Sequence, residues 1–483
     1  MRRASTLCSF AKGAPLRLLS TSSTRQGPQV CVVGAGPAGF YVTQHLVKTL
    51  PEANVDIYEK LPVPFGLVRF GVAPDHPEVK NVINTFTKTA QNPRVRFVGN
   101  VSLGKDLSLQ ELQRLYHAVI LTYGAEHDKS LGIPGEDLGN ILSARRFVGW
   151  YNGQPGDENL NPDLSTDTVA VLGQGNVALD VARVLLAPID YLKSTDITAH
   201  SLEALSKSQV KRVMLIGRRG PVQAAFTIKE LREMLKMEGC KSVFRQDDFK
   251  GVQEFLPSVA RPRKRLTELL AQAALDPKAE WLEAWKTAER SFEPIFYRSP
   301  AAFLPSSSKA GTVGAVKLAV TELQGEMSET QGVKNTGAFE DVKCGLVLRS
   351  IGYKGLPADP DIPFDSKSGV VRNSKGRVEG LPGVYCGGWL GTGPVGVIVN
   401  TMGNAFELGR LIEGDIKDGT INATTAKPGY LEAAKILDNK GVQAVSFKDW
   451  EKIDQEEQNR GKAIDKPREK IVSVSEMLKV VAN

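Results

Sequence analysis

Two glycine-rich segments of the chain have the residue types and the spacing that hold the pyrophosphate of a dinucleotide. The first, Gly34-Ala-Gly-Pro-Ala-Gly39, follows the apolar run Gln29–Val33 and precedes a helical pattern. In such a turn Gly34 permits the tight bend, Gly36 lets the backbone approach a pyrophosphate, and Gly39 lets the helix pack closely on the strand. Because the N-terminus of the helix then faces the phosphates, we expect a dinucleotide at this turn.

An acid at the end of the next strand completes the first pattern. The apolar segment Asn54–Glu59 reads as a strand, and its last residue lies twenty positions beyond Gly39. A carboxylate at this place accepts hydrogen bonds from the ribose hydroxyls of the nucleotide. Glu59 is therefore a candidate ribose ligand.

The same order of strand, glycine turn and helix recurs further along the chain. Thr168–Leu172 runs into Gly173-Gln-Gly-Asn-Val-Ala178, and the helical stretch Leu179–Leu186 follows. The second glycine of this turn is Gly175, and Ala178 stands at the third glycine position, where it still permits close helix packing. The segment thus predicts a second dinucleotide site.

The end of the following strand indicates which dinucleotide the second site takes. Val210–Gly217 is followed by Arg218 and Arg219, where a site for NAD would have an acid. Two adjacent guanidinium groups can clamp a 2′-phosphate with charge-assisted hydrogen bonds. The second site is therefore predicted to bind NADP rather than NAD. The alternative, that both glycine segments are plain loops, requires two such coincidences in one chain.

Four further segments fit a flavoprotein with two dinucleotide sites. The strands His117–Gly124 and Cys344–Tyr353 each place a Thr or Ser two residues before a glycine, as strands that close nucleotide domains do. Gly383–Trp389 is another strand and turn, and Gly391–Ile398 stands at a helix start where backbone amides would meet the ribityl chain and the ring edge of a flavin. These segments predict an FAD domain that is interrupted by an inserted NADP domain.

The predicted fold is α/β, with two Rossmann-like dinucleotide-binding domains. The FAD-binding domain is expected at residues 28–127 and 346–483, and the NADP-binding domain at residues 128–345. Residues 150–165 and 299–312 are rich in Gly, Pro, Asn and Ser and are predicted to be surface loops.

Composition and charge favour a globular protein with a separate leader. The 483 residues are 41% hydrophobic and 24% charged, and no run of about 18 apolar residues that could span a membrane occurs. Much of the net charge of +7 lies in the first 26 residues, which carry five basic and no acidic side chains and many Ser and Thr residues. This is the composition of a mitochondrial transit peptide, predicted at residues 1–27. The alternative is a merely disordered N-terminus.

The cysteines and histidines indicate that redox chemistry here comes from an organic cofactor. The five cysteines are scattered without a Cys-x-x-Cys pair, and no two of the five histidines have His-x-x-x-His spacing. A disulfide framework, a zinc site and a protein-borne redox dithiol all lack their spacing, so no metal site is predicted.

Three long segments carry a resemblance to a known family. Pro64–Pro77, Gly173–Ala182 and Ala225–Arg232 resemble the mitochondrial NADPH:adrenodoxin (ferredoxin) reductases, and the match extends from about residue 28 to the C-terminus. The resemblance implies FAD at the first turn and NADPH at the second. It implies FAD contacts at Ala38, Glu59, Leu67, Leu103, Trp389, Gly396, Val397 and Ile398. It implies NADP contacts at Gln174, Gly175, Asn176, Val177, Arg218, Arg219, Glu230 and the segment from Trp389 to Gly396.

The resemblance also implies two candidate catalytic residues. NADPH gives up a hydride, whereas an iron–sulfur protein accepts one electron at a time, and a flavin can join the two. His76 and Asp180 are the candidates to lie near the flavin and nicotinamide rings and to carry or stabilise a proton. Their alternatives are structural, because His76 lies in a turn-like stretch and Asp180 could pair with Arg183 at i, i+3.

The acceptor implied by the resemblance is an acidic 2Fe–2S ferredoxin, adrenodoxin. The implied pathway supplies electrons to mitochondrial cytochrome monooxygenases of steroid metabolism and to iron–sulfur assembly, in the matrix and with at most peripheral contact with the inner membrane. A cationic docking face suits such an acceptor. The residues predicted to form it are Arg232, Arg261, Arg263 and Arg265. The alternative is a solvated charged face; a nucleic-acid site would need interleaved aromatic residues or a recognised binding motif.

Two other function classes remain as alternatives. A disulfide reductase would need a dithiol, and a flavin monooxygenase would need a Phe-x-Gly-x-x-x-His string; the sequence contains neither. A non-catalytic flavoprotein that senses NADPH belongs to a different class, and nothing in the two complete patterns favours it. Rapid bleaching of the flavin by NADPH would distinguish an enzyme from such a sensor.

Overall fold

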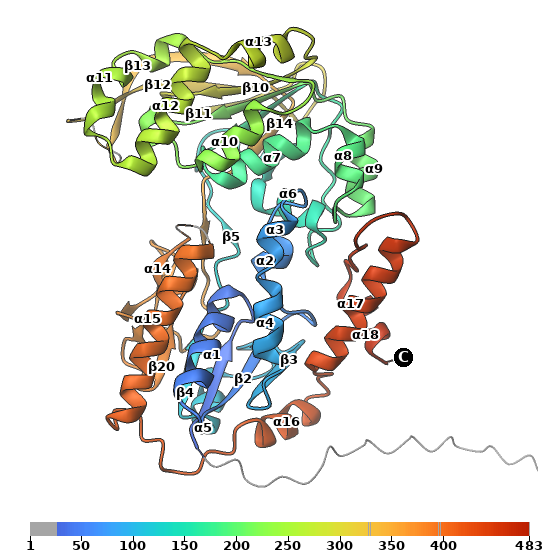
Figure 1. The fold of residues 1–483 in the computed structure, drawn as a ribbon, viewed down its shortest axis with the longest axis vertical. Coiled ribbons are helices and arrows are strands. Elements are labelled where there is room, and N and C mark those ends of the chain that lie inside the picture. The colour runs from blue at the N-terminus through green and yellow to red at the C-terminus, as the bar shows by residue number, and fades with distance from the viewer. Residues whose placement is uncertain (1–26, 327, 329, 395, 397, 483) are drawn as a thin grey trace, which may run out of the picture.

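The computed structural model describes residues 27–482, apart from residues 327, 329, 395 and 397. The predicted transit peptide, except for Gly27, and the predicted FAD contact Val397 lie outside the described residues. The described chain forms two halves, the lower and the upper in Figure 1, and each is built on its own sheet. The prediction of two Rossmann-like units, the second inserted into the first, is confirmed.

The first half contains a seven-stranded sheet in the order β18-β19-β20-β4-β1-β2-β3. Its five strands from β20 to β3 are parallel and almost wholly buried, because apolar side chains pack on both faces. The strands are β1 (Gln29–Val33), β2 (Asn54–Glu59), β3 (Val95–Gly99), β4 (Ala118–Leu121), β18 (Asn373–Ser374), β19 (Arg377–Val378) and β20 (Val384–Cys386).

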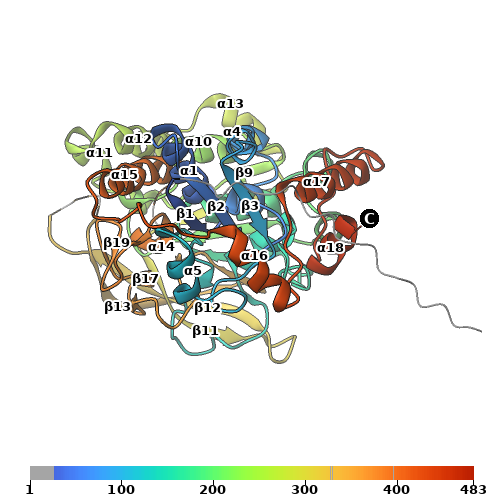
Figure 2. The same ribbon diagram turned by 90° about the horizontal axis from the view of Figure 1, so that it is seen from below.

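Helices cover the two faces of this sheet, as Figure 2 shows from below. On one face α1 packs along α15, and the C-terminal helices α17 and α18 join the same core. On the other face lie α5 and α16. The helices of this half are α1 (Pro37–Thr49), α2 (Leu67–Phe70), α3 (Pro77–Lys80), α4 (Ile83–Ala90), α5 (Leu109–Leu115), α14 (Trp389–Thr392), α15 (Ile398–Lys417), α16 (Tyr430–Asn439), α17 (Phe447–Lys462) and α18 (Val474–Ala482).

The second half contains a six-stranded parallel sheet in the order β6-β14-β7-β8-β10-β9. Its strands are β6 (Ile141–Ser143), β7 (Thr168–Leu172), β8 (Arg212–Ile216), β9 (Cys240–Ser242), β10 (Arg290–Ile295) and β14 (Leu346–Arg349). Helices pack on one face: α6 (Ala144–Asn152), α7 (Asn176–Leu186), α8 (Ile189–Lys193), α9 (Ala199–Ser206), α10 (Ile228–Leu235), α11 (Val252–Phe255), α12 (Arg261–Leu275) and α13 (Ala279–Lys286). Short 3-10 turns are η1 (Pro221–Gln223), η2 (Gln246–Phe249) and η3 (Leu256–Ser258).

A three-stranded antiparallel sheet packs on the other face of the second half. It consists of β11 (Arg298–Pro305), β12 (Val313–Leu323) and β13 (Val333–Lys343). The prediction of a loop over residues 299–312 is therefore wrong for its first part. β11 is an edge strand, and its pairing with β12 shifts register after Pro300. An edge strand tolerates prolines because it needs hydrogen-bond donors on one side only.

The chain crosses between the halves twice, and the two crossing segments pair with each other. β5 (His127–Asp128) lies antiparallel to β15 (Tyr353–Lys354). The strand β14, which begins at residue 346, pairs with β7 in the second sheet, so the boundary predicted at residue 346 is wrong and the return lies beyond Arg349. A further small pair joins β16 (Phe364–Asp365) to β17 (Val370–Val371).

None of the helices in the described ranges combines the length and the apolar composition that crossing a bilayer requires.

Candidate functional site

The first glycine turn has the geometry that its sequence predicts. Gly34 has φ of 109°, and its N–H donates to the carbonyl of Tyr58 at 2.7 Å, which attaches the turn between β1 and α1 to the neighbouring strand β2. A Cβ on Gly39 would lie 2.1 Å from the carbonyl oxygen of Gly34. The close approach of α1 to the turn therefore requires glycine at this position.

Gly36, in contrast, faces open space. It caps the N-terminus of α1, and a Cβ built on it meets no protein atom within 4 Å. The backbone of Gly66 lies nearby, since a Cβ on Gly66 would be 3.1 Å from the Cα of Gly36. The turn at the end of the segment Gly383–Trp389 also reaches this helix, because a Cβ on Gly388 would be 2.8 Å from that of Ala38. The helix N-terminus, with the backbone of Gly66 and of Gly388 nearby, forms a place that fits a pyrophosphate.

Glu59 lies at the end of β2, directly beside this turn. Its Oε2 accepts from the N–H of Ala35 at 2.9 Å, and its Oε1 accepts from the N–H of Leu61 at 3.2 Å. Burial raises the pKa of Glu59, whereas the two backbone donors oppose this. The carboxylate is thus held in place by the protein, and each oxygen keeps a lone pair for a ribose hydroxyl.

The other predicted FAD contacts differ in their surroundings. Leu67 is 40% exposed at the start of α2, and Trp389 begins α14 with its ring 5.8 Å from that of Tyr353. Gly396 has φ of 86° just before α15, whose first residue is Ile398. Leu103 differs from these, because it packs against the apolar core on the α5 face of the sheet.

The second glycine turn repeats the geometry of the first. Gly173 has φ of 130°, and a Cβ there would lie 2.2 Å from the carbonyl oxygen of Ser350. Gly175 caps the N-terminus of α7, and its Cβ would also meet no protein atom within 4 Å. Ala178 is fully buried beneath the turn. The second turn therefore leaves the same open place at a helix N-terminus.

Polar residues of the second turn hold the neighbouring loops. Nε2 of Gln174 donates to the carbonyl of Ile295 at 3.2 Å. Oδ1 of Asn176 accepts from the N–H of Thr227 at 2.8 Å. Val177, the remaining predicted contact of this turn, is partly buried against the core. These side chains shape the turn as well as being candidates to meet a nucleotide.

Arg218 and Arg219 follow β8, and their backbone is anchored on both sides. The hydroxyl of Thr321 donates to the carbonyl of Arg218 at 2.7 Å, and the N–H of Tyr297 donates to the carbonyl of Arg219 at 3.1 Å. Burial lowers the pKa of Arg219, and the nearby charges of Arg218 and Arg263 lower it further. Within the described part of the chain, no carboxylate pairs with Arg218 or Arg219. This concentration of positive charge suits a phosphate.

A buried cluster of charged side chains lies where the two halves meet. The predicted catalytic residue His76 comes from the first half and is 6% exposed. Its Nε2 lies 2.7 Å from Oε2 of Glu233, and its Nδ1 lies 3.8 Å from Oε1 of Glu230, both on α10. These three side chains could reach one metal ion, but Arg183 of α7 already lies beside both glutamates. The cluster therefore reads as an ion-pair network.

Asp180, the other predicted catalytic residue, belongs to the same cluster. Its Oδ1 accepts from Nη2 of Arg183 at 2.7 Å, so the i, i+3 pair expected as the structural alternative is present. Burial of this carboxyl nevertheless raises its pKa to about 7, and the negative charge of Glu230 adds to the increase. Asp180 can therefore gain and lose a proton near neutral pH.

Two members of this cluster were missed in the sequence. Asp75 lies within the segment Pro64–Pro77 and Glu233 directly follows the segment Ala225–Arg232, but the sequence predicts no role for either residue. Asp75 precedes His76, and Glu233 stands three residues after Glu230 on α10, where i, i+3 spacing puts both on one helix face. The i, i+3 spacing of the two glutamates was the sequence signal that could have identified Glu233 as a member of the cluster.

The predicted docking residues lie on α10 and α12, which pack against each other. Arg232, Arg261 and Arg265 are exposed, and among the described residues none of the three pairs with a carboxylate. Arg263 differs, because it is half-buried and donates to the carbonyl of Ala224 on the side of Arg219. The structure thus separates Arg263 from the other three side chains.

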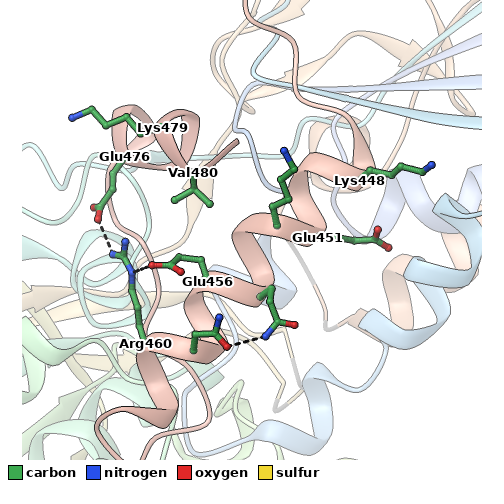
Figure 3. A pocket seen from close by; sticks show the side chains of 10 residues that line it. Lys448, Glu451, Glu456, Arg460, Glu476, Lys479 and Val480 are labelled. Carbon is green, nitrogen blue, oxygen red and sulfur yellow. Dashed lines mark hydrogen bonds and ion pairs between the residues drawn. The ribbon is translucent and has the colours of Figure 1, made fainter. Parts of the chain in front are cut away.

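An open groove of about 780 Å³ lies elsewhere, between α17 and α18 (Figure 3). Charged side chains line it, and Arg460 bonds with Glu456 at 2.8 Å and with Glu476 at 2.7 Å. It contains none of the predicted site residues.

Known proteins resemble the chain over nearly its whole length. Residues 32–98 match the family model described as NAD(P)-binding Rossmann-like domain. The mitochondrial NADPH:adrenodoxin oxidoreductases of Homo sapiens and Drosophila melanogaster are 54% and 51% identical to it; each covers 96% of the chain, and the matches span 94% and 96% of those relatives. The solved structure of Mycobacterium tuberculosis FprA in complex with NADPH matches with a TM-score of 0.87 and 36% identity, over 95% of this chain and 100% of that one.

Proposed function

The chain belongs to the NADPH:adrenodoxin oxidoreductase family, which makes it an FAD-dependent enzyme that oxidises NADPH, and from this premise we propose that it passes single electrons to an acidic 2Fe–2S ferredoxin. The observation that carries the proposal is the pair of open glycine turns. Each stands at a helix N-terminus, and the buried cluster of His76 and Asp180 lies where the two halves meet.

The residues of the first turn are suited to hold FAD. The open face of Gly36 and the N-terminus of α1 receive its pyrophosphate, and the fixed carboxylate of Glu59 receives a ribose. FAD supplies the chemistry that joins a hydride donor to an acceptor of single electrons. Gly175 and α7 offer the corresponding place to NADPH, and Arg218 with Arg219 selects its 2′-phosphate.

The buried cluster where the two halves meet, which we call the junction cluster, consists of Asp75, His76, Asp180, Arg183, Glu230 and Glu233. It supplies a proton site. We assign this role to Asp180 and His76, because Asp180 titrates near neutral pH and Nε2 of His76 shares a hydrogen bond with Glu233. Burial keeps water from these groups, which strengthens their electrostatic effect on a bound nicotinamide.

We expect flavin reduction by NADPH to accelerate as the pH rises through about 7, and Asp180→Asn to abolish this dependence. The raised pKa leaves Asp180 neutral at lower pH and ionised at higher pH. An ionised carboxylate stabilises the positive charge that the nicotinamide gains when its hydride leaves. Stopped-flow absorbance of the flavin measures the rate. Asp190→Asn, at an exposed position on α8, should keep the wild-type profile. If Asp180→Asn keeps the pH step, the proton belongs to another group.

The exposed arginines of α10 and α12 are proposed to receive the ferredoxin. Arg232, Arg261 and Arg265 carry positive charge that no described carboxylate neutralises. Such a surface attracts an acidic partner and orients it during the encounter, and dissolved salt screens the attraction. Arg263 donates a hydrogen bond to the carbonyl of Ala224. It stays among the residues that we propose to contact the ferredoxin.

Arg265→Glu is expected to raise the KM for ferredoxin about tenfold or more at low ionic strength, because charge reversal turns an attraction into a repulsion. The difference should shrink at high salt. Steady-state kinetics with a mitochondrial ferredoxin measures both effects. The control Lys105→Glu makes the same charge change at an exposed position of the first half and should have little effect. An unchanged KM in Arg265→Glu at low salt would remove Arg265 from the docking surface.

The direct test of the proposed function is NADPH-dependent reduction of cytochrome c by the leaderless protein, with and without a mitochondrial ferredoxin. A large ferredoxin-dependent rate that falls with salt supports the proposal. Rapid flavin reduction without ferredoxin dependence would leave the cofactors in place and assign the acceptor to another class, such as a quinone.

The site of action is proposed to be the mitochondrial matrix, with at most peripheral membrane contact. The relatives are named as mitochondrial, and the basic, acid-free leader predicts import. Electron supply to monooxygenases of steroid metabolism and to iron–sulfur assembly remains part of the same proposal. Import of the full chain into isolated mitochondria, with loss of residues near 1–27, tests the location.

A further inference from the structure

A single guanidinium group connects the two halves beside the proposed reaction centre. Arg183 lies on α7, in the second half, and its side chain is 5% exposed. Nη2 donates to Asp75 of the first half at 3.1 Å, and Nε donates to the other oxygen of the same carboxylate. Asp75 is thus held by a two-pronged hydrogen bond across the junction, the geometry that arginine and carboxylate favour.

The same guanidinium also holds two acids of its own half. Nη2 donates to Asp180 at 2.7 Å, and Nη1 donates to Glu230 at 2.7 Å. All three nitrogens of Arg183 therefore bind carboxylates. Lysine could not replace these contacts, because a single ammonium nitrogen cannot span three carboxylates in a fixed plane.

The electrostatics of the cluster favour a positive charge at the position of Arg183. Burial alone would raise the pKa of Asp75, but the hydrogen bonds from Arg183, its positive charge and smaller contributions from neighbouring groups together outweigh burial and lower the pKa. Burial likewise opposes the charge on Arg183, yet its carboxylate partners raise the pKa of the guanidinium. The link between the halves is thus an ion pair that stays charged at neutral pH.

Arg183 also lies close to the second nucleotide turn. It is on the helix that Gly175 caps, two turns from its start. Because Arg183 itself belongs to α7, its contact with Asp75 links the position of Asp75 directly to the helix whose N-terminus is proposed to receive the nucleotide. Asp75 directly precedes the candidate catalytic residue His76 in the sequence.

We propose that Arg183 is a positioning residue that sets the separation of the two nucleotide sites by holding Asp75 of the first half against Asp180 and Glu230 of the second. The inference rests on the proposed function in one respect, that FAD and NADPH occupy the two turns. Arg183 itself need touch neither cofactor.

The separation of the halves can be measured without any catalytic assay. Nitroxide labels on Lys88→Cys in α4 and Glu268→Cys in α12 occupy exposed positions of the two halves, and double electron–electron resonance reports their distance. The leaderless protein lacks Cys8, and the native cysteines that could compete for label are buried: Cys31, Cys240, Cys344 and Cys386. The proposal expects Arg183→Lys to broaden or shift the distance distribution.

Asp75→Asn is a second variant, in case Arg183→Lys fails to fold. It keeps the shape of the side chain and weakens only the contact across the junction. Glu78→Gln is the matched control, because Glu78 also pairs across the junction, with Lys229 at 2.5 Å, but both partners are half exposed. An exposed pair contributes little, so Glu78→Gln should keep the wild-type distribution. A wild-type distribution in both Arg183→Lys and Asp75→Asn would overturn the proposal.

Kinetics then separates positioning from general damage. Hydride transfer to the flavin is expected to slow at least about tenfold in Asp75→Asn, because misplaced reactants lose rate steeply, while the Kd for NADP⁺ changes less than about threefold. Equal losses of rate and affinity would overturn the positioning role. Both measurements precede any electron acceptor, so they hold whether or not ferredoxin is the partner.

Discussion

Replacing Gly36 with valine is expected to give a folded protein that no longer binds FAD. A Cβ at Gly36 meets no protein atom within 4 Å, so the apoprotein has room for the new side chain. The same space lies at the N-terminus of α1, where the pyrophosphate is proposed to bind, and the methyl groups of valine would occupy it. Visible flavin absorbance of the purified protein measures the loss, and circular dichroism with thermal melting checks the fold.

Two other glycines provide controls for this result. Gly175→Val places the same side chain in the equally open second turn, and it should keep FAD but lose NADP⁺ binding. Gly39→Val should instead damage the fold, because its Cβ would lie 2.1 Å from the carbonyl oxygen of Gly34. Retention of stoichiometric FAD by Gly36→Val would show that the first turn does not hold the pyrophosphate.

The glycine turns could be predicted from the sequence because their constraints are local. The strand, the turn and the helix of each follow one another within about 20 residues, and each glycine has a distinct steric role that neighbouring residues impose. Gly34 and Gly173 adopt the positive φ that the turn needs, while Gly36 and Gly175 leave the open space. A dinucleotide site of this kind is therefore readable before any fold is known.

The junction cluster could not be predicted in the same way, since its members come from distant parts of the chain. The contact between Arg183 and Asp75 joins positions 108 residues apart, and the contact between His76 and Glu233 joins positions 157 apart. From sequence, Arg183 had a nearer partner in Asp180, and that local pair is indeed present. Only the packing of the halves shows that Arg183 binds Asp75 as well.

The domain boundary predicted at residue 346 is wrong for a related reason. The segment around β14 reads correctly as a buried strand, but an apolar strand carries no mark of the sheet that it joins. Its pairing with β6 and β7 assigns it to the sheet of the second half, and both partner strands lie far away in the sequence. Strand existence is local information, whereas strand pairing is not.

The cationic run at the start of α12 shows how helix geometry sorts residues that look alike in sequence. Arg261 and Arg265 are four residues apart and share one helix face, which is exposed. Arg263, between them, points to another side and meets the carbonyl of Ala224. A charge run identifies a cationic surface, and the helical period decides which of its members can reach a partner.

Substituting both Arg218 and Arg219 with glutamine is expected to weaken NADPH binding by roughly 100- to 10,000-fold, because each charged hydrogen bond to a phosphate contributes about 1.5–3 kcal/mol. Binding of NADH, which has no 2′-phosphate, should change little. The ratio of kcat/KM for the two nucleotides would then move toward NADH. Steady-state flavin turnover with an artificial electron acceptor measures this ratio.

The repulsion among the arginines allows the predicted role of Arg218 and Arg219 to be tested by a second measurement, the increase in Tm that NADP⁺ causes. Burial and then the charges of Arg218 and Arg263 lower the pKa of Arg219, so the positive charges repel one another, and a bound anion is expected to relieve this repulsion. NADP⁺ should therefore raise the Tm of the wild type strongly and that of the double variant weakly. Arg212→Gln is the matched control. Arg212 begins β8, the strand that precedes Arg218 and Arg219, but its charge is paired with Glu293 at 2.5 Å. If NADPH and NADH weaken equally in the double variant, the two arginines support the turn without reading the 2′-phosphate.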